Sequence, residues 1–300
     1  MSNTIPVFYR PEQNASQQGG SPSPQKPEHV VRSWQPHGFP LELRSFPPAS
    51  REELCLVHAP EYVLGVLEGD LPNGFGTFSE QVAEALPYTT GSFVAAALHA
   101  FRTKGVAVSP TSGFHHAQHG RGEGCCTFNG LMVAASKLVR AGAKQVAILD
   151  LDAHVGNGTQ DILARLPSLA RHVAHYTYGG DGGTGLDGAS LAGLLEGLLP
   201  RWKAEGVEVV LYQAGADPHM DDPLGGYLTS EEMRLRDRTV FQACARLGLP
   251  LAWNLAGGYQ QVDGLDAARD FDAATRPVLD LHDNTFRECA AAWLPVRGDA

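Results

Sequence analysis

The chain has 300 residues, 43% hydrophobic and 19% charged, with a formal net charge of −10. This length is enough for a full-sized core, and we expect residues 1–300 to form one domain. The acidic balance argues against direct nucleic-acid binding, which requires basic patches. We see no signal peptide and no apolar run long enough to cross a membrane. Five scattered cysteines without a CxxC motif indicate reduced thiols, as in the cytoplasm.

The first predicted elements are a strand and a helix separated by a long loop. "IPVFY" predicts the strand, and residues 10–29, rich in Pro, Gly, Ser and Gln, predict a loop that leads into a helix near Pro27. From residue 50 helical patterns alternate with short apolar runs. The predicted helices are 50–69, 91–105, 128–143, 191–206, 230–248 and 272–293, and the predicted strands are 105–110, 145–152, 172–178, 207–217 and 250–259. This alternation predicts a parallel sheet with helices on both faces.

Polar or glycine-rich segments follow four of the predicted strands. They are "TSGFHHAQHGRGEGCC" (111–126), the segment 150–154, "AGADPHMDDPLGG" (214–226) and "AGGY" (256–259). In sheets of this kind, ligands bind at the carboxyl ends of the strands. We therefore expect these four segments to line one pocket.

Asp150, Asp152 and His154 alternate along the chain, and in an extended segment their side chains would share one face. A carboxylate beside an imidazole provides half of a zinc site, and catalytic zinc needs one or two further ligands with one position left for water. Asp217 is the best third ligand. Two simpler interpretations stay open: a buried hydrogen-bonded Asp–His pair, and an aspartate before proline that only forms a turn.

The adjacent His115 and His116 are either surface residues of a glycine-containing loop or a catalytic pair. As a pair, one would take a proton from metal-bound water while the other holds or donates a proton to the leaving group. Each ring needs a partner for its second nitrogen, and Asp150 and Asn157 are available. An aspartate raises the basicity of its imidazole and an asparagine does not, which would separate the two roles.

Five motifs occur in an order that resembles the zinc-dependent histone deacetylase family, which includes acetylpolyamine amidohydrolases and acetoin-utilisation proteins. They are "GFHHAQ" (113–118), "GCCTFN" (124–129), "DLDAHVGNGTQ" (150–160), "QAGADPHMDDPLGG" (213–226) and "AGGY" (256–259). Weaker similarity extends over 56–69 and the final helix, and the chain looks like a bacterial member. The resemblance implies an arginase/deacetylase-type α/β fold, in which helices flank a central parallel sheet of about eight strands.

The resemblance also implies a zinc-dependent amidohydrolase that removes an acetyl or other acyl group from an amine by attack of metal-activated water. The residues that it assigns are Asp152, His154 and Asp217 to the metal, His115, His116, Asp150, Asn157 and Tyr259 to catalysis, and Gly124, Cys125 and Leu224 to substrate binding. Tyr259 and the metal would together stabilise the oxyanion. Fe²⁺ could replace Zn²⁺, and K⁺ could bind near Asp150.

Two residues depart from the family pattern. Val155 stands where a second histidine usually follows the metal ligand, but strand alternation would point its side chain away from the metal. Cys125 stands where the family usually has an aromatic wall of its lysine tunnel. The smaller wall weakens the assignment to acetyl-lysine specifically, and a wider tunnel would admit a longer acyl group or a bulkier amine.

The substrate stays open between acyl-lysine in proteins and a small acylated amine such as an acetylated polyamine. An arginase-like hydrolase with two manganese ions is disfavoured, because Gly156 stands where that motif needs an aspartate. A non-catalytic acyl-lysine-binding module is a third hypothesis, which the complete set of ligands, histidines and tyrosine argues against. The oligomeric state is not predicted.

Overall fold

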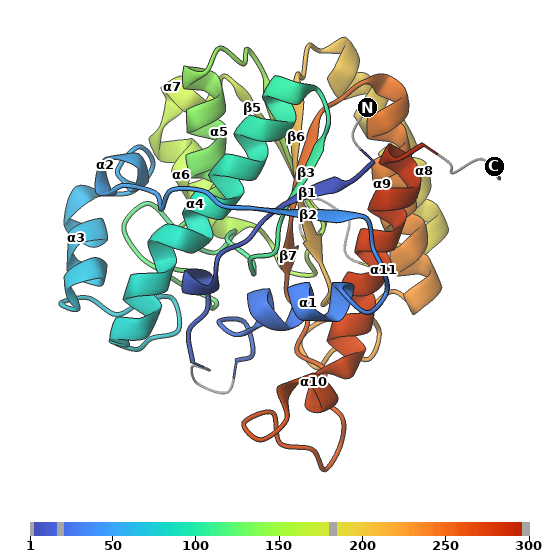
Figure 1. The fold of residues 1–300 in the computed structure, drawn as a ribbon. Coiled ribbons are helices and arrows are strands. Elements are labelled where there is room, and N and C mark those ends of the chain that lie inside the picture. The colour runs from blue at the N-terminus through green and yellow to red at the C-terminus, as the bar shows by residue number, and fades with distance from the viewer. Residues whose placement is uncertain (1–2, 17–20, 180–184, 296–300) are drawn as a thin grey trace.

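The centre of the molecule is a single parallel sheet (Figure 1). The computed structural model describes residues 3–16, 21–179 and 185–295, and within them the sheet has seven strands in the order β2-β1-β3-β7-β6-β4-β5. The strands are β1 (Ile5–Phe8), β2 (Leu41–Arg44), β3 (Val106–Ser109), β4 (Val146–Asp150), β5 (Val173–Thr177), β6 (Val209–Gly215) and β7 (Leu251–Ala256). The predicted parallel α/β sheet is confirmed, with seven described strands where we expected about eight.

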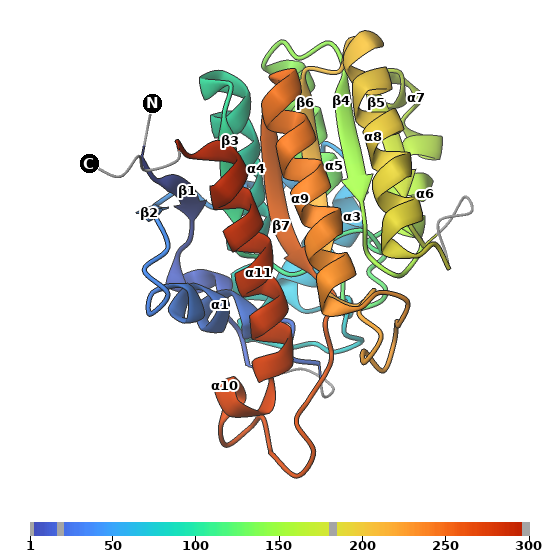
Figure 2. The same ribbon diagram turned by 90° about the vertical axis from the view of Figure 1, so that its right-hand side faces the viewer.

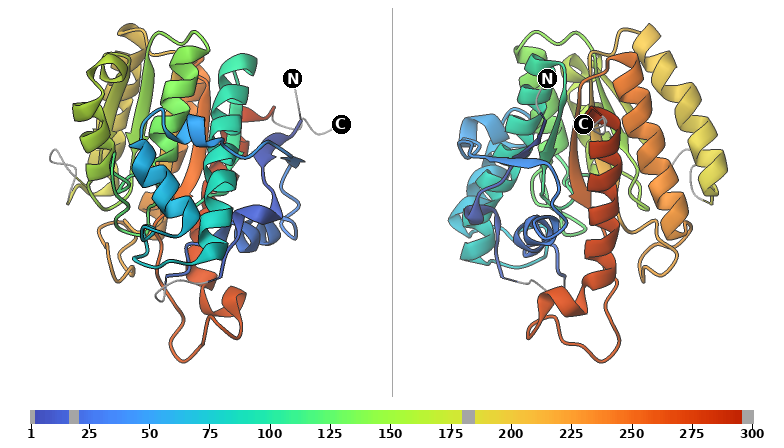
Figure 3. Two further views of the ribbon diagram at one scale, coloured as in Figure 1. Left: turned by 90° about the vertical axis from the view of Figure 1, so that its left-hand side faces the viewer. Right: turned by 45° about the vertical axis from the view of Figure 1, so that its right-hand side comes forward.

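Helices cover both faces of this sheet. They are η1 (Pro11–Gln13), α1 (Lys26–Trp34), α2 (Arg51–Leu54), α3 (Pro60–Glu68), α4 (Glu80–Thr103), α5 (Gly130–Arg140), α6 (Asn157–Arg165), α7 (Pro167–Ala170), α8 (Gly188–Ala204), α9 (Ser230–Leu247), α10 (Phe271–Ala274) and α11 (Arg276–Trp293). Helices α8, α9 and α11 lie side by side on one face (Figure 2), and α3, α4 and α5 lie on the other (Figure 3). Among the described residues, no helix has the length and apolarity needed to cross a bilayer.

The alternation of side chains along the central strands supplies two hydrophobic cores. In β4, Ala147 and Leu149 join the core beneath α8, α9 and α11, whereas Val146 and Ile148 join the core beneath α3, α4 and α5. Every residue of β4, β6 and β7 is buried. A strand that is buried on both faces has a continuous run of apolar residues, and for this reason the sequence predicted these three strands.

Some elements were missing from the sequence prediction. Strand β2 pairs only with β1 at the sheet edge and is partly exposed, so its residues carry no apolar pattern. Helix α6, which the sequence analysis did not predict, begins at Asn157 directly after Gly156 and includes Gly158. Helix α4 begins at Glu80, well before the predicted start at 91, because Ser79 caps it by accepting a hydrogen bond from the Val82 amide.

Candidate active site

Asp152, His154 and Asp217 converge where β4 and β6 end. One potential ligand atom from each residue lies within 4.8 Å of the others. The Nδ1 atom of His154 is 3.0 Å from Oδ1 of Asp152 and 2.9 Å from Oδ2 of Asp217. Both carboxylates are buried, and buried charges of this kind are stable only when they are paired or bind a metal.

The electrostatics of this group suit a divalent cation. Burial and the neighbouring Asp152 charge raise the pKa of Asp217 to about 7. Contacts with the two carboxylates raise the pKa of His154 to about 11. Two buried carboxylates repel each other, and a divalent ion placed between them would compensate their charge. Two carboxylates and one imidazole form a donor set that fits a catalytic zinc site, in which water or substrate takes a fourth position.

The backbone after β4 does not continue as the extended strand that the sequence argument assumed. Strand β4 ends at Asp150, and residues 152–154 form a bend. The bend is held by backbone amides: that of Ala153 donates to Oδ1 of Asp217 (3.1 Å), and that of His154 donates to Oδ1 of Asp152 (3.0 Å). The ligand side chains therefore meet because of this turn, and strand alternation was the wrong reason for expecting it.

The two adjacent histidines have the partners that the sequence suggested. Nδ1–H of His115 donates to Oδ2 of Asp150 at 2.7 Å, and Nδ1–H of His116 donates to Oδ1 of Asn157 at 2.7 Å. Asp150 is fixed in turn by the side-chain amide of Gln213, which donates to Oδ1 at 2.9 Å. The two ring centroids are 4.0 Å apart. With both Nδ1 atoms engaged, each Nε2 is left as the atom that can exchange a proton with a substrate.

The surroundings of the two rings shift their pKa values in opposite directions. Burial opposes a charge on His115, but the carboxylates of Asp150 and Asp152 outweigh it and raise the pKa of His115 to about 9. Burial and the adjacent His115 lower the pKa of His116 below its usual value. Near neutral pH, His115 is therefore protonated and His116 is neutral.

Both histidines and two of the three candidate ligands line one small cavity. Its lining residues are Ser23, Ser112, Gly113, His115, His116, Gly124, Cys125, Cys126, Asp152, His154, Gly257 and Tyr259. Gly124 and Cys125, two predicted substrate-binding residues, are in this wall. Leu224, the third, is 58% exposed and is not part of it. Within the described residues the half-buried Val155 is also not part of the cavity wall.

Tyr259 reaches the cavity from the segment that follows β7. Its amide donates to Oδ2 of Asp222 at 2.7 Å, which fixes the backbone on the far side of the glycine pair. Burial and the carboxylates of Asp152 and Asp217 raise the pKa of the Tyr259 phenol above its usual value. The phenol therefore stays protonated and can donate a hydrogen bond to a substrate oxygen.

We predict that Gly257→Ala destabilises the fold by about 3–5 kcal/mol. Gly257 has a φ of +52°, and a Cβ there would lie 2.3 Å from Cγ of Asp217. The matched control is Gly264→Ala, at φ +78° with no atom within 4 Å of the added Cβ, for which we expect about 1–2 kcal/mol. Urea unfolding of both variants measures the difference. If both variants lost the same free energy of unfolding, the close approach of the added Cβ to Asp217 would not contribute to the destabilisation.

One buried residue beside the site was missed by the sequence analysis. Lys26, at the start of α1, is 1% exposed, and its Nζ donates to the carbonyl oxygen of Gly257 and lies 5.8 Å from the centroid of the Tyr259 ring. Burial lowers the pKa of Lys26 to about 8, although the Asp217 and Asp222 carboxylates oppose that shift. The sequence carried no local indication that Lys26 would be buried against Gly257, because Lys26 lies in a loop-like segment far along the chain from Gly257.

Comparisons with known proteins agree with this arrangement. A family model described as "Histone deacetylase domain" matches residues 22–182, more than half of the chain. An uncharacterized protein of Picosynechococcus sp. is 32% identical over 232 residues, which cover 70% of this chain and 76% of that protein. The acetylpolyamine amidohydrolase of Mycoplana ramosa is 32% identical over 170 residues, which cover 48% of this chain and 49% of that protein. The chain thus spans about half the length of that relative.

A solved structure shows the same fold. The crystal structure of the HDA15 HD domain superposes with a TM-score of 0.71 at 20% sequence identity, covering 97% of this chain and 94% of that chain. The family model establishes the relationship by sequence, and this structure extends the fold over nearly the whole chain. The chain belongs to the histone deacetylase domain family.

Proposed function

We propose that this chain is a zinc-dependent deacylase, in which the whole chain forms one catalytic domain that hydrolyses the linear amide of an acylated amine. The observation that carries the proposal is that Asp152 and His154, which lie beside Asp217, line one cavity together with His115, His116 and Tyr259. Asp152, His154 and Asp217 would hold the ion. A bound zinc ion would polarise the amide carbonyl and lower the pKa of a water molecule.

The two histidines would divide the proton transfers between them. His116 is neutral, so its Nε2 accepts a proton from the attacking water and returns that proton to the nitrogen of the departing amine. His115 stays protonated beside it and stabilises the negative charge that develops on the substrate oxygen. Asp150 and Asn157 fix the two rings through their Nδ1 atoms. The net reaction adds water across the C–N bond and releases a carboxylic acid and an amine.

Tyr259 would act on the substrate oxygen. Its phenol is protonated and borders the same cavity as both histidines. A donor aimed at an oxygen that gains charge in the transition state contributes more to the rate than to substrate binding. Tyr259 is therefore assigned to oxyanion stabilisation.

The substrate class is supported by charge and by the relatives. The net charge of −10 favours an acylated polyamine, which keeps positive charge on its remaining amines, whereas an acylated lysine side chain is neutral. One relative is named an acetylpolyamine amidohydrolase, which supports the small-amine alternative, and the family description supports acyl-lysine. We further propose a cytoplasmic location, in keeping with five free cysteines. Fe²⁺ in place of zinc and K⁺ near Asp150 remain part of the proposal.

The test is a panel of acylated lysine peptides and acetylated polyamines, offered to the zinc-loaded protein and to protein treated with a chelator. We expect release of the free amine from at least one class, loss of that activity after chelation, and recovery after zinc is restored. Turnover of neither class by protein that demonstrably binds zinc would contradict the deacylase assignment. That outcome would favour the non-catalytic binding module.

A further inference from the structure

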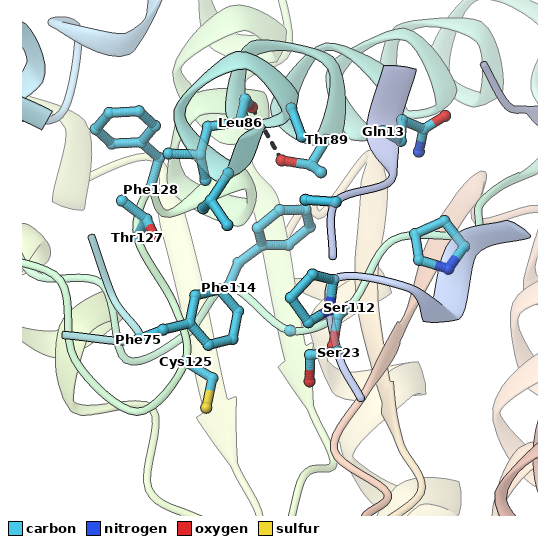
Figure 4. Close-up of a pocket in the computed structure, with 16 residues that line it drawn as sticks. Gln13, Ser23, Phe75, Leu86, Thr89, Ser112, Phe114, Cys125, Thr127 and Phe128 are labelled. Atoms are coloured by element: carbon cyan, nitrogen blue, oxygen red, sulfur yellow. Dashed lines mark hydrogen bonds between the residues drawn. The ribbon is translucent and has the colours of Figure 1, made fainter. Parts of the chain in front are cut away.

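A second, apolar pocket lies beside the catalytic cavity (Figure 4). It is the larger of the two hollows. Ser23, Ser112, Gly113 and Cys125 line both hollows, and we call these four residues the shared wall. The apolar pocket therefore lies on the other side of Cys125, one of the predicted substrate-binding residues, from the catalytic cavity.

The pocket is lined mainly by aromatic and aliphatic side chains. The rings of Phe75, Phe114 and Phe128 line one part of the pocket, and Leu86 of α4 lines another (Figure 4). Val82 and Ala85, from the same helix, also line the pocket. Phe114 directly precedes His115, and its amide donates to Oε1 of Gln213 at 3.0 Å. The same Gln213 holds Asp150. Gln213 therefore connects the pocket wall at Phe114 to Asp150, the hydrogen-bond partner of His115.

The shared wall contains only small side chains. Cys125 has a φ of +64°, and its backbone is fixed by a hydrogen bond from its amide to the carbonyl oxygen of Gly74 at 3.0 Å. Only a thiol projects from this fixed position, and the other wall members contribute two hydroxymethyl groups and a glycine. At these four positions no side chain larger than a thiol or a hydroxymethyl group lies between the two hollows.

We propose that this pocket receives the acyl chain of the substrate, and that the protein prefers straight-chain acyl groups from butyryl to octanoyl over acetyl. This inference rests on the proposed deacylase function. An acetyl methyl group would stop at the shared wall and leave the apolar lining uncovered. Each additional methylene that is buried there should raise kcat/KM about fourfold, until the pocket is filled.

The first test uses the wild-type protein and one amine that carries acetyl, butyryl, hexanoyl or octanoyl. We expect kcat/KM for the hexanoyl amide to exceed that for the acetyl amide by at least about tenfold. An acetyl amide that is hydrolysed as well as the longer amides would overturn the inference while leaving the deacylase function intact.

The second test narrows the pocket with Ala85→Leu. Ala85 is buried in the pocket wall, and the matched control Ala95→Leu lies on the same helix in a different surface groove. Alanine and leucine are both good helix formers, so neither change weakens α4 itself. We expect the hexanoyl-to-acetyl ratio of kcat/KM to fall at least about tenfold in Ala85→Leu and to stay unchanged in Ala95→Leu. An unchanged hexanoyl-to-acetyl ratio in Ala85→Leu would contradict the proposal that this pocket receives the acyl chain.

A binding measurement keeps the inference testable if no amide is hydrolysed. Hexanoate and acetate, the acids that the reaction would release, are titrated into wild-type and Ala85→Leu protein by calorimetry. Tighter binding of hexanoate by the wild type, lost in Ala85→Leu, would support the acyl pocket even if the proposed activity fails. Equal affinity for the two acids would refute it.

Discussion

An Asp217→Ala variant should lose zinc and should hydrolyse acyl amides at least about a thousandfold more slowly than the wild type. Asp217 supplies one of three candidate ligands and is completely buried, so no other side chain can reach its place without rearrangement. Metal content by elemental analysis and kcat/KM on the best substrate of the panel measure the two effects.

The matched control for this prediction is Asp221→Ala, an exposed aspartate four residues further along the chain whose side chain is 75% accessible. It should keep both zinc and activity. Asp217→Asn serves as a second variant, because its amide oxygen can still accept the hydrogen bond from the Ala153 amide. If Asp217→Asn folds normally, retains zinc and turns over substrate at the wild-type rate, Asp217 is not a ligand.

Tyr259→Phe should lower kcat by about 10²–10³ while zinc content and KM change little. The substitution removes only the phenol oxygen, and the hydrogen bond from the Tyr259 amide to Asp222 does not depend on the side chain. The loss falls on kcat because the donor acts mainly on charge that develops in the transition state.

Steady-state kinetics on one acyl amide provide the measurement. Tyr227→Phe is the control, since this tyrosine is 44% exposed and removal of its hydroxyl should leave kcat unchanged. A rise in KM with unchanged kcat for Tyr259→Phe would instead mean that the phenol only binds the ground state. That outcome would remove Tyr259 from the catalytic group without affecting the metal assignment.

The central strands and the polar segments after them were readable from the sequence. Strands β4, β6 and β7 are apolar throughout because helices cover both of their faces. Motifs such as "DLDAHVGNGTQ" keep chemically distinctive residues close together in the chain. Donor chemistry indicated Asp150 and Asn157 as the available partners of the two histidines, and the structure shows Asp150 beside His115 and Asn157 beside His116.

Other features of the site depend on contacts between distant segments. Lys26 and Gly257 are 231 residues apart in the chain, and no local pattern connects them. The bend at 152–154 includes a hydrogen bond from the Ala153 amide to Asp217, which lies in the segment after β6. The alternation of residues along an extended strand therefore does not explain why the candidate ligands lie close together.

By itself, therefore, the sequence determined the α/β class, the strand ends that carry the chemistry and the residues that could bind a metal. These follow from hydrophobic periodicity and from side-chain chemistry, which are properties of neighbouring residues. Only the tertiary structure decided the opposite charge states of His115 and His116, the burial of Lys26 and the apolar pocket behind Cys125. Burial, desolvation and cavity shape arise from packing between segments far apart in the chain, and residue order alone does not specify them.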